Sequence, residues 1–375
     1  MCFVVTSDLT VGAFLKGYAH ELRRQGHRLT IVCSPGGGTA GFEGLATILP
    51  LPMRREPSPL MDLVALVRMI RLFRKVRPDI VVYATPKASL LASIGAFLSG
   101  INTRVYELWG LRMETSVGFG RKVLRALERV TVALSSSVVP NSSSLASRAS
   151  ELGVLRGKSP VLLGEGSSHG VDVERFSRSA VRADVDTGTR QFLDRSSGFT
   201  IGFVGRLHPD KGVDVLIEAV RLCLASGDQV RALLVGGDEG ARLPSLAELP
   251  VHTVGQVADP RPYLAEMDVI VLMTLREGFP NVILEAASME VPAIVADSTG
   301  SIDSVVDGCT GYVVPTGDVQ ALAIAIRSLL VDPAKRSTMG HAGRERVEDQ
   351  FSHHLVCKLH VDFYIEEWSR RTAAS

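Results

Sequence analysis

The chain of 375 residues lacks the cysteine patterns that hold small secreted domains or zinc sites together. Its cysteines are odd in number, lie far apart and include no C-x-x-C pair: Cys2, Cys33, Cys223, Cys309 and Cys357. Such spacing indicates neither a disulfide framework nor a zinc site. We therefore expect a reducing compartment and no required metal.

Long apolar runs are missing as well. No stretch approaches the ~18–20 uncharged apolar residues that a membrane-spanning helix needs. The first residues, "MCFVVTSDLT", have no basic region ahead of their apolar ones, so they predict a strand and not a signal peptide. The sequence thus predicts a cytoplasmic protein.

A strong charge of either sign is also absent. The formal net charge of +1 argues against bulk electrostatic binding to nucleic acid. The composition is that of a globular protein, with 46% hydrophobic and 22% charged residues and no low-complexity tract. At ~100–200 residues per domain, this length predicts two domains.

Short runs rich in Val and Ile alternate with longer helical patterns in the first half. Apolar strands separated by helices are typical of a parallel sheet that is covered on both faces. The predicted strands are "CFVVT", "LTIVC", "DIVVYA", "TRVYEL" and "SSVVP". Residues 1–175 are therefore predicted to form a Rossmann-like α/β domain.

The same alternation restarts after a polar stretch from Ser177 to Ser197, which has the composition of a linker or surface excursion. The second series of strands is "TIGFVG", "RALLVG", "VHTVG", "DVIVLM", "PAIVAD" and "GYVV". It predicts a second doubly wound domain, residues 176–352, with the helix at 353–375 packing back on the first domain. We expect ligands at the carboxyl ends of the strands, in a cleft between the domains.

The stretch "GFVGRLHPDKG", residues 202–212, is a candidate anion site. A strand is predicted to end near Val204, and Arg206 and Lys211 flank a Pro-Asp turn before a helix begins near Gly212. Cations beside the free amides of a helix N-terminus would bind a diphosphate. Two solvated surface cations are the alternative interpretation.

The stretch "REGFPNVILEA", residues 276–286, holds two glutamates. Pro280 disfavours helical geometry at Phe279 and suits a first helical turn, so a helix is predicted to begin at about Pro280 or Asn281. Glu277 then lies in the loop and Glu285 on the helix. The two carboxylates should therefore approach a ligand from different directions, with the amides at the helix start between them.

Together these stretches resemble the second domain of retaining GT-B glycosyltransferases of family GT4. The resemblance covers "GFVGRLHPDKG" and the run from "REGFPNVILEA" to "GYVVPTGD", and the two glutamates match the family's E-x7-E motif. In the first half, "TPKASLLAS" and "GSSHGVDVERF" are similar to bacterial members that build surface polysaccharides. The resemblance implies the GT-B fold, two Rossmann-like domains facing a cleft.

The resemblance also implies roles for individual residues. Arg206 and Lys211 would hold the donor diphosphate, Glu277 would contact the transferred sugar, and Glu285 would contact the ribose. Catalysis would rest on Glu277, Arg206 and Lys211, and retention would follow front-face attack, with the leaving phosphate helping to take the proton. Further donor contacts are expected from Gly12, Val257, Gly278, Phe279, Pro280, Asn281 and Val282.

The first domain departs from the usual family pattern. The first loop has only Gly12, in "DLTVGAF", where many members have two glycines. Trp109 stands where many members have a histidine, and His169 where close relatives often have asparagine. We assign Trp109 and His169 to the acceptor or sugar pocket.

The predicted partners are a nucleotide sugar, UDP-linked in preference to GDP-linked, and a glycan or lipid-linked acceptor. The transferred group is expected to be a hexose or N-acetylhexosamine, without a cofactor. One alternative is an isomerase resembling the UDP-N-acetylglucosamine 2-epimerases, which acceptor-independent conversion of the donor would reveal. A two-lobed periplasmic binding protein would need an export signal, which this N-terminus does not have.

Three short stretches resemble the motifs of other sites. Gly166 to Gly170 satisfies G-x-S-x-G with a predicted strand before it, but "VDVERFSRS" does not continue as the helix that a hydrolase elbow requires. Asp184 and Asp186 form D-x-D in the polar stretch, where solvated charges are expected. "SPGGG", from residue 34, lacks the Gly-Lys-Ser/Thr ending of a P-loop.

The segment "LVALVRMIRLFRKVRP", from Leu63, is basic and amphipathic. Such a helix can lie on an anionic bilayer, which would make the inner membrane leaflet a further, peripheral partner. It can equally be a crossover helix with its arginines in water. If the acceptor is lipid-linked, residues 63–77 are the candidate docking surface.

Overall fold

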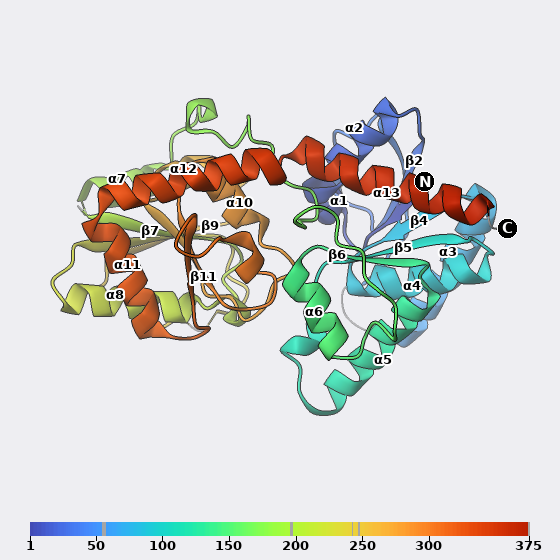
Figure 1. The fold of residues 1–375 in the computed structure, drawn as a ribbon, viewed down its shortest axis with the longest axis horizontal. Helices are drawn as coiled ribbons and strands as arrows, with labels where there is room; N and C mark the ends of the chain where they lie inside the picture. Colours follow the sequence, from blue (N-terminus) through green and yellow to red (C-terminus); the bar gives the residue numbers. More distant parts are fainter. Residues whose placement is uncertain (55–57, 196–197, 242, 247, 374–375) are drawn as a thin grey trace. The chain divides into compact units, whose positions relative to one another are not determined.

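The computed structural model describes residues 1–54, 58–195, 198–241, 243–246 and 248–373. Contacts between Cα atoms divide the chain into two compact units, one of residues 1–170 with 353–375 and one of Val171–Ser352. The division falls a few residues before the expected boundary after residue 175. Within the described residues, each unit contains a six-stranded sheet (Figure 1).

The first sheet has the strand order β3-β2-β1-β4-β5-β6, and all neighbouring strands are parallel. Its strands are β1 (Cys2–Val4), β2 (Leu29–Cys33), β3 (Ala46–Pro50), β4 (Ile80–Tyr83), β5 (Thr103–Leu108) and β6 (Ser137–Pro140). The helices of this unit are α1 (Asp8–Phe14), α2 (Lys16–Arg24), α3 (Pro59–Val76), α4 (Pro86–Leu98), α5 (Gly118–Leu134), α6 (Ser143–Glu151) and α13 (His353–Ala373), with short 3-10 turns η1 (Gly37–Thr39) and η2 (Arg112–Glu114).

Apolar residues cover both faces of the first sheet. One buried cluster includes residues of α3, α4, α5 and α6, and a second includes residues of α1, α2 and α13. In Figure 1, α13 lies above the sheet, and α4 and α5 lie below it. This double cover explains why the strands are continuous apolar runs in the sequence.

The second sheet has the order β12-β11-β10-β7-β8-β9, again with parallel neighbours. Its strands are β7 (Phe199–Val204), β8 (Val230–Val235), β9 (Val251–Gly255), β10 (Val269–Leu272), β11 (Ala293–Ala296) and β12 (Gly311–Val314). The helices are α7 (Thr187–Arg195), α8 (Val213–Ala225), α9 (Arg261–Ala265), α10 (Asn281–Ser288), α11 (Val319–Val331) and α12 (Pro333–Gln350), with turns η3 (Arg178–Ala180), η4 (Pro209–Lys211) and η5 (Ile302–Ser304). Helix α8 packs on α11, and α10 packs on α12.

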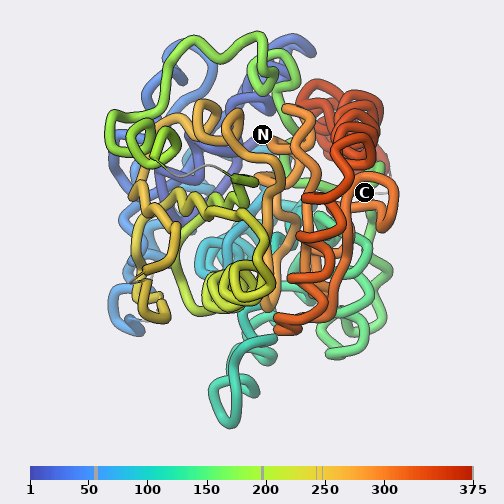
Figure 2. The backbone as a smooth tube through the Cα atoms, turned by 90° about the vertical axis from the view of Figure 1, so that its left-hand side faces the viewer, coloured from blue at the N-terminus to red at the C-terminus, as the bar shows by residue number. Residues whose placement is uncertain are grey.

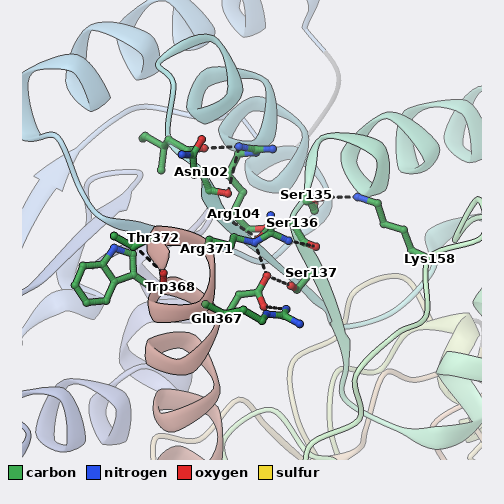
Figure 3. Close-up of polar contacts among 12 residues, drawn as sticks. Asn102, Arg104, Ser135, Ser136, Ser137, Lys158, Glu367, Trp368, Arg371 and Thr372 are labelled. Carbon is green, nitrogen blue, oxygen red and sulfur yellow. Dashed lines mark hydrogen bonds and ion pairs between the residues drawn. The ribbon is translucent and has the colours of Figure 1, made fainter. Parts of the chain in front are cut away.

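Buried polar contacts attach α13 to the first sheet. The Tyr364 hydroxyl donates to the buried Glu107 carboxylate of β5 at 2.6 Å, and His360 Nδ1 lies 3.2 Å from the same oxygen. Further along α13, Glu367 accepts hydrogen bonds from Ser137 Oγ and Arg371 Nε, each at 2.6 Å (Figure 3). A buried carboxylate is costly unless it is hydrogen-bonded, so these contacts fix where α13 lies on the sheet.

Three local expectations were wrong. The polar stretch from 177 to 197 is no bare linker, because α7 forms within it and buries Thr189 and Leu193 in the second unit. The strand expected directly before the G-x-S-x-G stretch, in "SPVLLGEG" from residue 159, does not form. Strand β3 was not predicted. It lies at the edge of the sheet and is half-exposed, so its sequence has no continuous apolar run.

Among the described ranges, no helix is long and apolar enough to cross a bilayer.

Candidate functional site

The predicted donor residues gather where the strand order of the second sheet reverses. Strands β7 and β10 are neighbours, yet the chain runs from β7 towards β8 and β9 and from β10 towards β11 and β12. Loops leaving such a pair diverge to the two faces and open a crevice at the carboxyl edge. Arg206 and Lys211 follow β7, and Glu277 follows β10, so all three belong to the two loops of this switch point.

The loop after β7 is held by backbone contacts that leave no space for a side chain at Gly212. This glycine has φ +66°, and a Cβ atom there would lie 2.0 Å from the carbonyl oxygen of Met273 at the end of β10. His208 Nδ1 accepts a hydrogen bond from the Asp210 amide at 3.2 Å, which starts turn η4. The turn places Lys211 beside the second loop.

Each cation in these loops has an acidic partner. Lys211 Nζ donates to the Glu277 carboxylate, and both side chains are only 17% exposed. Arg206 pairs with Glu239 at 2.5 Å, and Arg276 lies 3.3 Å from Asp210. The Lys211–Glu277 contact thus joins a residue predicted to bind the diphosphate to the residue predicted to bind the transferred sugar.

The loop after β10 turns into α10 as predicted. Pro280 is the N-cap with ψ 90°, and α10 begins at Asn281, so Glu277 lies outside the helix and Glu285 lies within it. The backbone of this loop packs closely against Gly300, since a Cβ on Gly300 would lie 2.3 Å from the Gly278 carbonyl oxygen. Phe279 is buried against Phe351, with ring centroids 5.4 Å apart. The side chain of Phe279 therefore anchors the loop, and only its backbone is offered to a ligand.

Glu285 has an unusual electrostatic environment. Burial raises the pKa of its carboxyl to about 7; the Arg175 cation acts in the opposite direction, and the Asp259 carboxylate adds to the rise. Asp259 belongs to the loop after β9 that also contains Val257. The Asp259 carboxylate is therefore close enough to Glu285 to affect its pKa. Val257, the candidate contact for the base, is in the same loop as Asp259, so it lies near Glu285, the candidate contact for the ribose.

The first sheet has a switch point of its own, between β1 and β4. Thr6 follows β1 and Thr85 follows β4, and their hydroxyl oxygens lie 2.8 Å apart. Thr85 has φ +67°, a left-handed conformation that is strained for a β-branched residue and that is often found at functional sites. Thr85 was not predicted as a site residue, since nothing in "ATPKA" signals a positive φ.

Trp109 and His169 come together in the first unit through Phe14, which the sequence did not mark as a site residue. The Phe14 ring stacks on Trp109 at 4.9 Å and meets the edge of His169 at 4.6 Å. Within the described structure, the Trp109 indole nitrogen is buried without a hydrogen-bond partner. Burial lowers the pKa of His169 to about 3, so its imidazole is neutral.

The placement of Gly12 differs from the expected one. Helix α1 begins at Asp8, with Ser7 as its N-cap, so Gly12 lies inside a helix and not in the first loop. A Cβ on Gly12 would lie 2.6 Å from the Gly38 carbonyl oxygen. Its small size is therefore explained by packing against η1.

Comparison with known proteins identifies the family of this chain. The family described as "Glycosyl transferases group 1" matches residues 198–332, and "Glycosyl transferase 4-like domain" matches residues 10–162. The capsular polysaccharide biosynthesis glycosyltransferase CapM of Staphylococcus aureus is 34% identical over 350 residues, covering 91% of this chain and 90% of CapM. This chain belongs to the GT4-type glycosyltransferases of the GT-B fold.

Solved structures share the fold of this GT4 protein. HepE of Anabaena, in complex with UDP and glucose, aligns over 97% of this chain and 98% of its own with a TM-score of 0.75 and 20% identity. Sucrose-phosphate synthase of Thermosynechococcus elongatus aligns over 100% and 99% with a TM-score of 0.78 and 18% identity. At these identities the likeness concerns the fold alone.

Other features of this GT4 chain lie outside the donor loops. Asp184 pairs with Arg190, and Asp186 accepts from the Thr189 amide at 3.0 Å at the start of α7, so the D-x-D pair has local structural roles. The G-x-S-x-G stretch is followed by turns and no helix. In the described ranges, no group of three or more His, Cys, Asp or Glu could hold a metal ion.

A hollow of about 830 Å³ lies at the opposite edge of the first sheet. Residues at the amino ends of its strands line it, together with Arg77 and Trp368. None of the predicted site residues borders it. In doubly wound sheets, ligands bind at the carboxyl edge, so we assign the chemistry to the switch-point loops.

Proposed function

We propose that this enzyme transfers a hexosyl or N-acetylhexosaminyl group from a UDP-sugar to a glycan or lipid-linked acceptor of a surface polysaccharide, with retention of configuration. The biosynthetic role is supported by the name of CapM, a capsular polysaccharide glycosyltransferase. The UDP donor is supported by HepE, which was solved with UDP and with UDP-glucose.

The observation that carries the proposal is the Lys211–Glu277 contact at the switch point of the second sheet. A cation, a carboxylate and the amides at the start of α10 meet there, which are the groups that a sugar diphosphate needs. Cations and helix-start amides bind phosphate oxygens. The carboxylate accepts hydrogen bonds from sugar hydroxyls.

The Lys211 ammonium group donates a hydrogen bond to the Glu277 carboxylate. We propose that the diphosphate takes over Lys211 when the donor binds, which frees the Glu277 carboxylate for hydroxyls of the transferred sugar. Arg206 would exchange Glu239 for a phosphate oxygen in the same way. Since both cations already stand in the loops, little reorganisation is needed before charge develops on the leaving group.

The transfer step is a front-face displacement. The bond between the anomeric carbon and the diphosphate oxygen breaks, and the acceptor oxygen bonds to the same face of that carbon. The acceptor proton passes to an oxygen of the leaving diphosphate, and Lys211 and Arg206 stabilise the remaining negative charge. No residue of the chain forms a covalent intermediate, and Glu277 acts by positioning the sugar.

The nucleoside half of the donor is assigned to Glu285 and the loop after β9. Glu285, on α10, would accept ribose hydroxyls, and Val257 would contact the base. The electrostatic link between Glu285 and Asp259 supports a common neighbourhood for these two contacts.

A panel of nucleotide sugars tests the proposal. Thermal stabilisation and slow donor hydrolysis should appear with one or more UDP-sugars, and both should weaken in Lys211→Ala. The control is Lys335→Ala, an exposed lysine of α12, which should leave both readouts unchanged. Stabilisation by no UDP- or GDP-sugar would overturn the assignment.

The same assay separates related functions. Conversion of a UDP-sugar to its epimer without acceptor would identify an isomerase instead of a transferase. We propose that transfer requires no metal, so a chelator should leave donor hydrolysis unchanged. The anomeric configuration of the product, read by NMR, tests retention.

A further inference from the structure

A groove follows the amino edge of the first sheet, on the side opposite its switch point. It consists of the hollow of about 830 Å³ and a second hollow of about 560 Å³. Arg77, Pro78, Asp79 and Trp368 border both hollows, so the two adjoin and form one amino-edge groove. Ligand pockets usually measure ~300–1,000 Å³. The groove therefore has room for a ligand, and the proposed transfer reaction does not use it.

The amino-edge groove is strongly basic. The arginines that border it are Arg23, Arg28, Arg74, Arg77 and Arg371. Among the lining residues that the structure describes, Asp79 is the single acidic one. The chain as a whole has a net charge of only +1, so this surplus is local. A cleft lined by charges of one sign attracts ligands of the opposite sign, which predicts an anionic ligand.

Part of this charge has a structural explanation. Helices α2, α3 and α13 each have two basic residues in their last turn, and cations there are stabilised by the helix dipole. Arg371 also donates to the Glu367 carboxylate and to the Ser136 carbonyl oxygen. The dipole does not account for Arg28, which directly precedes β2. In the described part of the chain, neither Arg28 nor Arg77 forms an ion pair with an acidic side chain.

Arg77 stands where the backbone favours a different residue. It caps the end of α3 in the left-handed conformation, with φ 47° and ψ 58°, and its amide donates to the Phe73 carbonyl oxygen at 2.8 Å. Glycine is the usual residue at such a helix end, because a Cβ atom is strained there. Strained positions of this kind cluster at ligand sites. A glycine would complete the helix end equally well, so the fold does not explain the Arg77 side chain.

Trp368 contributes an aromatic surface to the groove. Helix α13, in red in Figures 1 and 2, lies on the outside of the first unit. Trp368 is half-buried and packs against the cluster that α13 covers. In Figure 3 its ring points away from the hydrogen-bonded group of Glu367, Ser137 and Arg371. A partly exposed indole offers a flat apolar face, against which the C–H bonds of a sugar ring can pack.

The shape of the groove favours an extended ligand. Its lining includes residues at the starts of β3, β2, β4 and β5. In the strand order of the sheet, β3 and β5 are four spacings apart, which is about 19 Å at about 4.8 Å per spacing. A single phosphate would occupy only a small part of this length. A chain of several sugars can follow it and meet arginines at more than one point.

We propose that the amino-edge groove binds an acidic oligosaccharide, with Arg28 and Arg77 on its carboxylates and Trp368 against a sugar ring. Arginine is suited to this role because its planar group binds a carboxylate through two parallel hydrogen bonds. Asp79 accepts hydrogen bonds from sugar hydroxyls. The choice of a glycan over other acidic chains rests on the proposed function, since that enzyme extends a glycan. A glycan bound at this edge leaves the carboxyl edge of the sheet free.

Calorimetric titration of the full chain with oligogalacturonic acid, an acidic sugar chain, tests the proposal. Binding should be measurable and should weaken as the salt concentration rises. A malto-oligosaccharide of the same length has no carboxylates and should not bind. Arg77→Gly and Arg28→Ala should each weaken binding by about tenfold or more, because each removes a charge-assisted contact.

Arg156→Gly is the matched control for Arg77→Gly. Arg156 is an exposed arginine of the same unit with φ 52°, and it is not among the residues that border the groove. Both substitutions remove one positive charge and place glycine at a left-handed position. Only Arg77→Gly should weaken binding. Neither should lower the midpoint of urea denaturation, because glycine is favoured at both positions.

Trp368 gives a direct readout of occupancy. The chain has two tryptophans, so Trp109→Phe leaves Trp368 as the indole whose fluorescence is measured. Its emission should change on titration with oligogalacturonic acid and stay constant with the malto-oligosaccharide.

Four results would overturn the proposal. Two of them are the absence of wild-type binding to oligogalacturonic acid and equal weakening by Arg77→Gly and Arg156→Gly. The others are equally tight binding of the uncharged chain and equally tight binding of polyuridylic acid, which would indicate a surface for nucleic acid. The titration contains no nucleotide sugar. A chain that binds the acidic oligosaccharide but no nucleotide sugar would therefore contradict the donor assignment and leave the groove assignment intact.

Discussion

Donor affinity should increase as the pH rises through about 7, because Glu285 must lose its proton before it can accept two ribose hydroxyls. Burial is the main cause of the raised pKa, with Asp259 adding to it and Arg175 opposing it. Below that pKa the carboxyl is neutral and carries its own proton. The form that binds donor is therefore the minor one at acidic pH.

The size of the effect follows from the ionised fraction. With a pKa of about 7, about one tenth of the protein has an ionised Glu285 at about pH 6, and about nine tenths has it at about pH 8. The apparent Kd is the intrinsic Kd divided by the competent fraction. It should therefore fall by about tenfold over this range.

The same shift has the opposite sign for stability. Because the folded-state pKa is raised above the ordinary value of 4.5, the neutral carboxyl is favoured by the fold. This stability contribution is complete below about pH 4.5 and is lost as the pH rises through about 7. Donor binding and intrinsic stability should thus change in opposite directions near neutral pH.

Calorimetric titration of the proposed donor at several pH values between about 6 and 8 measures the effect. Glu285→Gln should bind more weakly and should lose the part of the pH dependence that Glu285 causes, since glutamine does not titrate. Subtracting its profile removes contributions from other groups, including the donor. A wild-type Kd that is constant over this range, or a variant that keeps the wild-type slope, would refute the role assigned to Glu285.

Three further predictions concern the loops and the core. Gly212→Ala should lower the free energy of unfolding by about 1–3 kcal/mol more than Gly227→Ala, because both glycines have positive φ but only Gly212 faces a carbonyl oxygen; equal losses in urea denaturation would contradict this. Tyr364→Phe should cost about 1–3 kcal/mol, because it leaves the buried Glu107 short of a donor; an unchanged urea midpoint would contradict that. Lys211→Ala should lower kcat/KM for the donor by about 10- to 100-fold through the loss of a charge-assisted hydrogen bond; wild-type kinetics would count against the assigned role.

The start of α10 shows how far local sequence rules reach. A proline between Glu277 and Glu285 was sufficient to predict that the helix begins beyond Glu277, and the structure starts it at Asn281. Pro280 acts through sterics on its immediate neighbour, which do not depend on the rest of the fold. The strands were predicted for a similar reason, since burial on both faces demands an apolar residue at nearly every position.

The features that the sequence did not predict depend on neighbours that are distant in the chain. Gly12 was assigned to a loop because the helix start at Asp8 depends on Ser7 and on the packing of α1 against η1. Phe14 has no distinguishing pattern, and only the fold places its ring between Trp109 and His169. The edge strand β3 was missed because half-burial removes the continuous apolar signal.

The sequence by itself determined the architecture and the chemical groups of the candidate site. Two series of apolar strands with intervening helices specify two doubly wound sheets, and "GFVGRLHPDKG" with "REGFPNVILEA" supplies cations, carboxylates and helix-start amides. These are local properties, because each depends on neighbouring residues and on the period of burial.

Only the tertiary structure decided how those groups act on one another. It paired Lys211 with Glu277 across 66 residues of chain and raised the pKa of Glu285 through burial. Electrostatics and burial depend on distances in space, and these distances are set by the order of strands in the sheet and not by spacing along the chain.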